Sequence, residues 1–196
     1  MYEDRQDNQF TGFRNFVSII VFVARAFACS VEVFLHNPGT FGSRYFGLQA
    51  GAAVLLIFFW PAFCEPHHDA EWMLCFLAWH LLFSMAIRYR TRLRPHRGEP
   101  EPHTRYSGTP RLMRFTGRMD EVKVKCMVEP LFTFLMGGLI GEVSPPVGGF
   151  LMVASAGLLV SNGLAADYER RRAADMHDAY LDQRRVVDRF RDLRRD

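Results

Sequence analysis

The stretch 143-VSPPVGGFLMVASAGLLVSNGLAA-166 contains 24 consecutive residues without a formal charge. A second stretch, 45-YFGLQAGAAVLLIFFWPAF-63, contains 19 such residues. A helix crosses the hydrocarbon core of a bilayer with about 20 apolar residues, at a rise of roughly 1.5 Å per residue. Two such runs in a chain of 196 residues predict a membrane protein rather than a single soluble domain.

The basic residues gather in two blocks. Of the 24 Lys and Arg residues, 20 lie in Arg88–Lys125 and Arg170–Arg195. Apolar spans separated by basic segments are typical of membrane proteins, in which Lys and Arg stay on the cytoplasmic side. The mean hydropathy of −0.04 hides this segregation, because apolar and charged blocks cancel. No nucleic-acid recognition module accompanies the basic segments, so we expect no nucleic-acid partner.

The apolar and polar segments predict the organisation of the chain. We expect an all-α integral membrane protein with about four transmembrane helices in two hairpins, an N-terminal amphipathic helix and a long basic C-terminal cytoplasmic helix. The expected segments are a polar leader (1–14), an amphipathic helix (15–36), a first hairpin (45–87), a basic loop (88–125), a second hairpin (126–166) and a helical tail (167–196).

Within the hairpins, we expect spans at Tyr45–Phe63 and Trp72–Ile87, then at Val128–Glu142 and Val147–Ala166. Pro145 and Pro146 mark the second turn, since proline cannot continue a helix. The arm Val128–Glu142 is short for a span, which leaves a tilted and a re-entrant helix as alternatives.

Positive-inside counting orients these spans. With the basic loop 88–125 in the cytoplasm, the turn 64–71 and the Pro-Pro turn lie outside, whereas 36–44 and the Arg-rich tail lie inside. A single crossing between 130 and 166 would put Arg170–Arg172 outside, so the rule favours a hairpin. We expect a bacterial inner or plasma membrane and a cytoplasmic C-terminus.

The first apolar segment is open to two interpretations. At 100° per residue, one narrow stripe contains Arg14, Ser18, Arg25, Cys29, Glu32 and His36. A continuous polar stripe predicts a helix in the membrane interface, with a span facing protein as the alternative. Arg25 and Glu32 are two turns apart, close enough to share a polar network.

The candidates for chemistry are few. His67, His68 and Asp69 are the densest possible metal ligands, but they form no motif at helical spacing, and we interpret them as a polar turn without a metal. The intramembrane polar candidates are Arg25, Glu32 and His80, which lies in the middle of a span. No phosphate loop, nucleophile elbow or dinucleotide fingerprint is present, and we expect no cofactor.

Two further patterns predict packing. Gly137, Gly141, Gly148 and Gly149 place small residues on both arms of the second hairpin, where helices can approach closely. In the tail, the partner seam Met176, Tyr180, Val187 and Phe190 follows a heptad spacing. Charge repulsion within this helix predicts that it packs on a partner or on another copy of the chain.

These patterns favour a non-catalytic structural or accessory subunit of a membrane complex. Its partners would be the lipid bilayer and a protein partner or a homo-oligomer, docked through the basic loop and the tail. Residues Arg111–Lys125 in that loop are expected to form a short interfacial helix on anionic lipid. The alternative is a small channel or transporter with a polar path around Arg25, Glu32 and His80. A membrane enzyme that uses the His67/His68 turn is the weakest hypothesis.

Overall fold

The computed structural model describes residues 3–64, 70–98, 104, 106–117 and 119–193, and every extended element assigned in these ranges is a helix. The elements are α1 (Glu3–Leu35), α2 (Leu48–Phe59), η1 (Trp60–Phe63), α3 (Glu71–Leu93), η2 (Pro95–Arg97), α4 (Met113–Thr116), α5 (Glu121–Lys123), η3 (Val124–Val128, a π-helical turn), α6 (Glu129–Gly141) and α7 (Pro145–Leu193).

Within the described residues, four helical stretches are long and apolar enough to cross a membrane. They are Arg14–Leu35 in α1, Glu71–Leu93, Glu121–Gly141 and Pro145–Phe190 in α7. The prediction of an all-α chain with about four helices of membrane length is confirmed in these terms. These four stretches are not the four spans that the sequence predicts. The first apolar segment is long enough to be a span, whereas Leu48–Phe63 is shorter than the length required of one.

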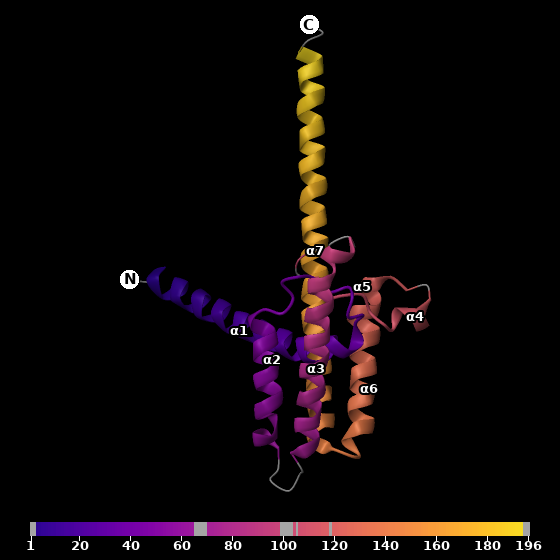
Figure 1. The fold of residues 1–196 in the computed structure, drawn as a ribbon. Coiled ribbons are helices and arrows are strands. Elements are labelled where there is room, and N and C mark those ends of the chain that lie inside the picture. Colours follow the sequence, from indigo (N-terminus) through magenta and orange to yellow (C-terminus); the bar gives the residue numbers. More distant parts are fainter. Residues whose placement is uncertain (1–2, 65–69, 99–103, 105, 118, 194–196) are drawn as a thin grey trace. The chain divides into compact units, whose positions relative to one another are not determined.

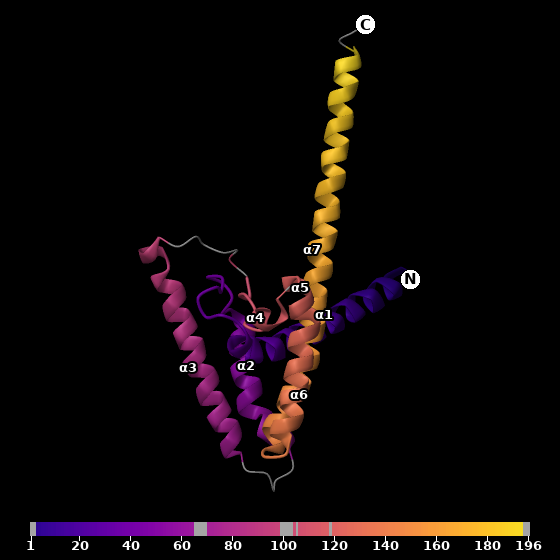
Figure 2. The ribbon, with the colours of Figure 1, turned by 90° about the vertical axis from the view of Figure 1, so that its right-hand side faces the viewer.

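The chain forms two compact units, residues 1–161 and residues 162–196. In the first unit, α2 pairs with α3, and α6 pairs with the first part of α7 (Figure 1). Helix α1 runs across the direction of α2, α3 and α6 in both ribbon views (Figure 2). The described part of the second unit, residues 162–193, is the remainder of α7.

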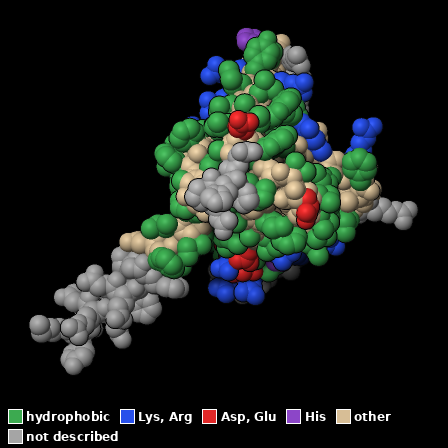
Figure 3. Space-filling view, turned by 90° about the horizontal axis from the view of Figure 1, so that it is seen from below, with side chains coloured by type: hydrophobic (Ala, Val, Ile, Leu, Met, Phe, Trp, Pro, Cys, Tyr) green, Lys and Arg blue, Asp and Glu red, His purple; other side chains and the backbone are tan. Residues whose placement is uncertain are grey.

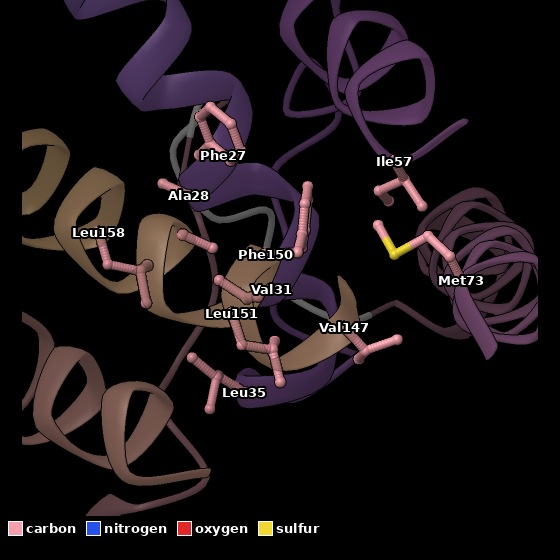
Figure 4. Close-up of a cluster of buried hydrophobic side chains, with 11 residues drawn as sticks. Phe27, Ala28, Val31, Leu35, Ile57, Met73, Val147, Phe150, Leu151 and Leu158 are labelled. Carbon is pink, nitrogen blue, oxygen red and sulfur yellow. The ribbon is translucent and has the colours of Figure 1, made fainter. Parts of the chain in front are cut away.

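The two faces of α1 belong to two separate hydrophobic clusters. One face contributes Phe27, Ala28, Val31 and Leu35 to the cluster drawn in Figure 4, with side chains from α2, α3 and α7. The opposite face contributes Cys29 and Val33 to a second cluster. The other members of that cluster are Phe41, Tyr45, Ala50, Ala53 and Ile87. Because every residue from 26 to 33 is buried, this part of α1 is the centre of the first unit.

Glycines bring the hairpin arms α6 and α7 together. A β-carbon added at Gly148 would lie 2.4 Å from the Cα of Gly141, and one at Gly137 would lie 3.0 Å from the carbonyl oxygen of Gly148. At Gly149 an added β-carbon would meet open space. Three of the four glycines singled out in the sequence therefore lie where the two helices approach most closely.

The turn of this hairpin differs from the expected one. Glu142–Ser144 form the turn, and Pro145 and Pro146 begin α7. Proline is well tolerated there, because the first N–H groups of a helix have no partner within the helix. The preceding arm starts at Glu121 rather than at Val128, so its 21 residues extend about 30 Å at the helical rise.

The first hairpin also differs in its limits. Helix α2 starts at Leu48, after Gly47 in an extended conformation, so the expected span from Tyr45 loses its first turn. Helix α3 instead continues to Leu93, six residues beyond the expected end at Ile87.

The end of the first unit that carries the turn of the second hairpin presents mainly hydrophobic side chains (Figure 3).

The described part of the basic loop makes contacts that the sequence does not predict. Part of it docks on the turn that follows α1, with backbone bonds from Asn37 N to Thr109 O (3.0 Å) and from Gly42 N to Tyr106 O (2.9 Å). A single antiparallel bridge joins His36 to Pro110. The described part of the loop and the turn 36–44, both expected on the cytoplasmic side, thus lie together at one end of the unit.

Candidate functional site

The buried half of α1 carries a cluster of paired charges. Arg25 Nη1 lies 3.2 Å from Glu32 Oε1 and donates a hydrogen bond of 2.7 Å to Ser161 Oγ. The hydroxyl of Tyr45 donates to the other carboxylate oxygen of Glu32. The Glu32 side chain is fully buried, and that of Arg25 is 21% exposed. A buried carboxylate is tolerated only when it is paired and hydrogen-bonded, and Glu32 meets both conditions.

The local fold explains why these groups meet. Arg25 and Glu32 are seven residues apart, so two helical turns place them on one face of α1. Tyr45 returns to that face from the segment after α1, where its ring packs against Phe41 at 4.8 Å between centroids. The cluster therefore ties α1 to the start of the first hairpin and, through Ser161, to α7.

A second buried pair lies at the end of α1. His36 Nε2 is 2.9 Å from Oε1 and 3.0 Å from Oε2 of Glu129, and both side chains are fully buried. His36 Nδ1 is 2.6 Å from the carbonyl oxygen of Ser107. A carbonyl oxygen only accepts, so Nδ1 carries a hydrogen and the pair shares one further proton between Nε2 and the carboxylate. The pair is then either imidazolium with carboxylate or imidazole with carboxylic acid.

An irregularity in the helix precedes Glu129. The π-helical turn Val124–Val128 comes directly before it, and Pro130, which has no N–H, follows it. π-turns inside helices occur mostly as single turns and frequently at functional sites. Here the turn precedes the carboxylate that meets His36, and it joins the loop side of the unit to α6.

Side chains from the basic loop make contacts next to this second pair. Lys125 Nζ lies 2.7 Å from Glu121 Oε1 and 3.3 Å from Ser107 Oγ. The hydroxyl of Tyr106 donates to Glu121 at 2.5 Å. Arg111 Nε donates to the carbonyl oxygen of His36 at 3.0 Å. The loop is thus fastened to the end of α1 and to the helix that begins at Glu121.

Arg94, the residue that follows α3, holds the same end. Its guanidinium donates to the carbonyl oxygens of Phe41, at 3.1 Å, and of Gly39. Although Arg94 belongs to a basic run that the sequence places in a solvated loop, it is buried. The turn after α1 is therefore held from the loop and from α3.

His80 does not join the Arg25–Glu32 pair. Its Nδ1 lies 3.0 Å from the carbonyl oxygen of Ser30, and its ring lies 6.1 Å from that of Phe34. The three intramembrane polar candidates thus separate into an ion pair and a histidine that bonds to backbone.

The sequence did not single out the partners of these groups. Tyr45 belongs to an expected apolar span, and neither Ser161 nor Glu129 is among the candidates that the sequence offers. An acidic residue directly before Pro130 in an apolar run was the available signal for Glu129. His36 was part of the polar stripe but was assigned to the turn.

The remaining candidates lie elsewhere. His67, His68 and Asp69 fall outside the described residues. Among the residues that the structure does describe, no group of three or more His, Cys, Asp and Glu side chains could hold a metal ion. The partner seam of the tail is described up to Phe190, and Met176, Tyr180, Val187 and Phe190 are all exposed.

An apolar groove of about 580 Å³ lies beside the buried half of α1. Its walls are Phe22, Val23, Ala26 and Phe27 of α1, Ala52, Leu55, Leu56 and Phe59 of α2, and Trp60 and Phe63 of η1. The groove is separate from the polar contacts, so it adds apolar surface rather than reactive groups to the site.

Comparisons with protein-family models, curated proteins and solved structures found no match for this chain.

Proposed function

We propose that the protein is a non-catalytic polytopic membrane protein, a structural or accessory subunit of a membrane complex. The observation that carries this proposal is the pairing of the buried charges. Glu32 bonds Arg25 and Tyr45, and Glu129 bonds His36, so these groups join distant segments of the chain. Buried pairs of this kind favour one arrangement of the surrounding helices, because separating the partners would leave a buried charge unpaired.

The proposed setting is a bilayer in which α3, the helix Glu121–Gly141 and the first part of α7 are embedded, together with the shorter α2. Many large apolar side chains on these helices are exposed, among them Leu82, Leu131 and Phe134, as expected for a lipid-facing surface. The basic loop and the tail would lie in the cytoplasm of a bacterial inner or plasma membrane. Helix α1 would cross the embedded helices rather than run parallel to them.

The competing hypothesis is transport along a polar path around Arg25, Glu32 and His80. A path of that kind would require the three groups to face one route through the unit. Each instead has its own partner in the fold, since Arg25 and Glu32 bond each other and His80 bonds the backbone at Ser30. These contacts favour a scaffold.

A charge swap distinguishes the two functions. Arg25→Glu and Glu32→Arg alone should each cause loss of monodisperse protein in mild detergent, because each places like charges together in a buried site. The double variant should recover much of it. An Arg171→Glu variant is the control, since its pair with Asp167 is exposed. Intact assembly in both single variants, with loss of an ion or solute flux, would instead favour transport.

The docking part of the proposal relies on two exposed surfaces. The tail presents the partner seam, and the basic loop presents Arg and Lys side chains near the ends of α3 and α5. A protein partner or a second copy of the chain would cover the seam.

A further inference from the structure

The segment between the docked loop and the helix that begins at Glu121 exposes large apolar side chains. Phe115 is 84% exposed, Met119 is 45% exposed and Met113 is 37% exposed. Exposed side chains of this size are unusual in a loop that faces water, and clustered ones mark contact surfaces. Helix α4, which carries Phe115, lies near α5 in the ribbon views (Figure 1, Figure 2).

This exposure is built into an ordered turn. Arg111 N donates to the carbonyl oxygen of Leu35 at 2.9 Å, which fixes the start of the segment on α1. Phe115 N donates to Leu112 O at 2.9 Å, and Met119 N donates to Thr116 O at 3.2 Å. The apolar side chains therefore stand on a backbone that the rest of the fold holds in place.

The charges around these side chains are mainly basic. Arg114 and Lys123 are exposed in the same stretch of the chain. Asp120 is exposed in the same stretch, whereas Glu121 is paired with Lys125. Aromatic and aliphatic side chains flanked by Lys and Arg are typical of segments that lie in the headgroup region of an anionic membrane.

The apolar surface continues into the proposed membrane span. Met127, Leu131 and Phe134 are exposed along the helix that begins at Glu121. Helix α4, which carries Phe115, lies near α5, from which this exposed surface continues into α6 (Figure 1, Figure 2). A bilayer fits both the apolar side chains and their position, whereas an acidic protein surface would account for the basic ones alone.

We propose that residues 111–117 and Met119 form a membrane-surface anchor that inserts Phe115 between lipid headgroups and prefers anionic lipid through Arg114. The anchor deepens the proposed function, because it relies on the helices around it being embedded in a bilayer. It assigns anionic lipid headgroups as the surface that this part of the basic loop contacts.

Photo-crosslinking tests the anchor in the full-length protein. The photoreactive residue benzoylphenylalanine replaces Phe115 in nanodiscs of equal parts phosphatidylcholine and phosphatidylglycerol, and adducts are identified by mass spectrometry. Lipid adducts are expected at this position, with phosphatidylglycerol in excess. Two matched sites serve as controls, Phe134 on the proposed span and Phe190 on the tail, which are 50% and 69% exposed. Phe134 should give lipid adducts and Phe190 should not.

The preference for anionic lipid is tested by adding Arg114→Gln to the protein that carries benzoylphenylalanine at position 115. The ratio of phosphatidylglycerol to phosphatidylcholine adducts should fall about fivefold, the effect of one basic side chain near an anionic surface. The exposed Arg189→Gln should leave it unchanged. An equal ratio with and without Arg114 would overturn the preference for anionic lipid.

The outcomes separate the anchor from the membrane proposal. Lipid adducts at Phe134 but none at Phe115, or protein adducts only at Phe115, would overturn the anchor and leave the embedded helices in place. Absence of lipid adducts at both sites would overturn the proposed membrane setting itself, and the anchor with it.

Discussion

At the residue scale, the contacts of the His36–Glu129 pair determine where its hydrogens can lie. Because Nδ1 must donate to Ser107, one proton has to lie between Nε2 and the carboxylate. Gln at position 129 can donate to a neutral imidazole nitrogen and so keep the contact without a charge. Ala leaves a buried polar nitrogen without a partner, which costs more than the net value of the bond.

We therefore expect Glu129→Ala to lower the free energy of unfolding by about 1–3 kcal/mol, and Glu129→Gln to lower it less. Thermal unfolding in detergent measures both. Glu142→Ala is the control, because Glu142 is an exposed glutamate just beyond the other end of α6. Equal losses for the Ala and Gln variants would show that the proton-sharing contact has no special value.

The sequence could predict the Arg25–Glu32 contact, because both residues lie on one helix and helical geometry fixes their spacing. It could not predict that Tyr45, Ser161 or Glu129 would complete the two clusters. These residues come from segments 13, 136 and 93 positions away from Glu32, Arg25 and His36, respectively. Such partners depend on how α1 crosses the other helices, which no local pattern encodes.

At the element scale, the approach of α6 to α7 depends on an absent side chain. A β-carbon at Gly148 would lie 2.6 Å from the backbone nitrogen of Gly141 and from the carbonyl oxygen of Gly137. Backbone atoms cannot move aside as the end of a flexible side chain can, so the helices would have to separate. Gly149, one residue on, has open space.

Gly148→Ala should accordingly destabilise the protein by about 1–3 kcal/mol, as overpacking does. Gly149→Ala should be neutral or stabilising by up to about 1 kcal/mol, because alanine favours the helix. Thermal unfolding of the two variants under identical conditions is the measurement. A similar effect at both positions would mean that the close approach does not matter for stability.

The ends of the helices are less predictable from local sequence patterns than the helices themselves. Apolar runs predicted most of the long helices, because length and composition alone make a helix of membrane length. The prolines were predicted as a turn, but Pro145 and Pro146 begin α7, since proline fits the first turn of a helix as well as it ends one. Helix α2 is shorter than its apolar run, because Gly47 is extended and Tyr45 lies before the helix, where its hydroxyl bonds Glu32.

At the scale of the whole molecule, the proposed topology puts the turn of the second hairpin on the extracytoplasmic side of the membrane. A Val143→Cys variant should react with a membrane-impermeant thiol reagent in intact cells, because Val143 is exposed in that turn. An Asp175→Cys variant should react only after lysis. The unsubstituted chain gives the background from its four native cysteines. Protection of position 143 in intact cells would contradict the orientation.

The exposed apolar seam of the tail predicts that this part of the molecule binds a partner. Residues 162–196 form a separate compact unit, and the partner seam Met176, Tyr180, Val187 and Phe190 is exposed on it. A helix of this kind is marginal in water without packing, and the repulsive pairs Asp178–Asp182 and Asp188–Asp192 weaken it further. A stable tail therefore implies that something covers the seam.

Deletion of 175–196 should leave membrane insertion intact, because the first unit ends at Ser161, but should weaken complex formation. Insertion is measured by carbonate extraction, and assembly by the mass of the detergent-solubilised particle. Val187→Asp with Phe190→Asp should reproduce the loss of assembly in the full-length chain, whereas the same changes at Arg185 and Arg189, off the seam, should not. If particle mass and partner recovery stay unchanged after the deletion, the tail is a solvated extension and the seam docks nothing.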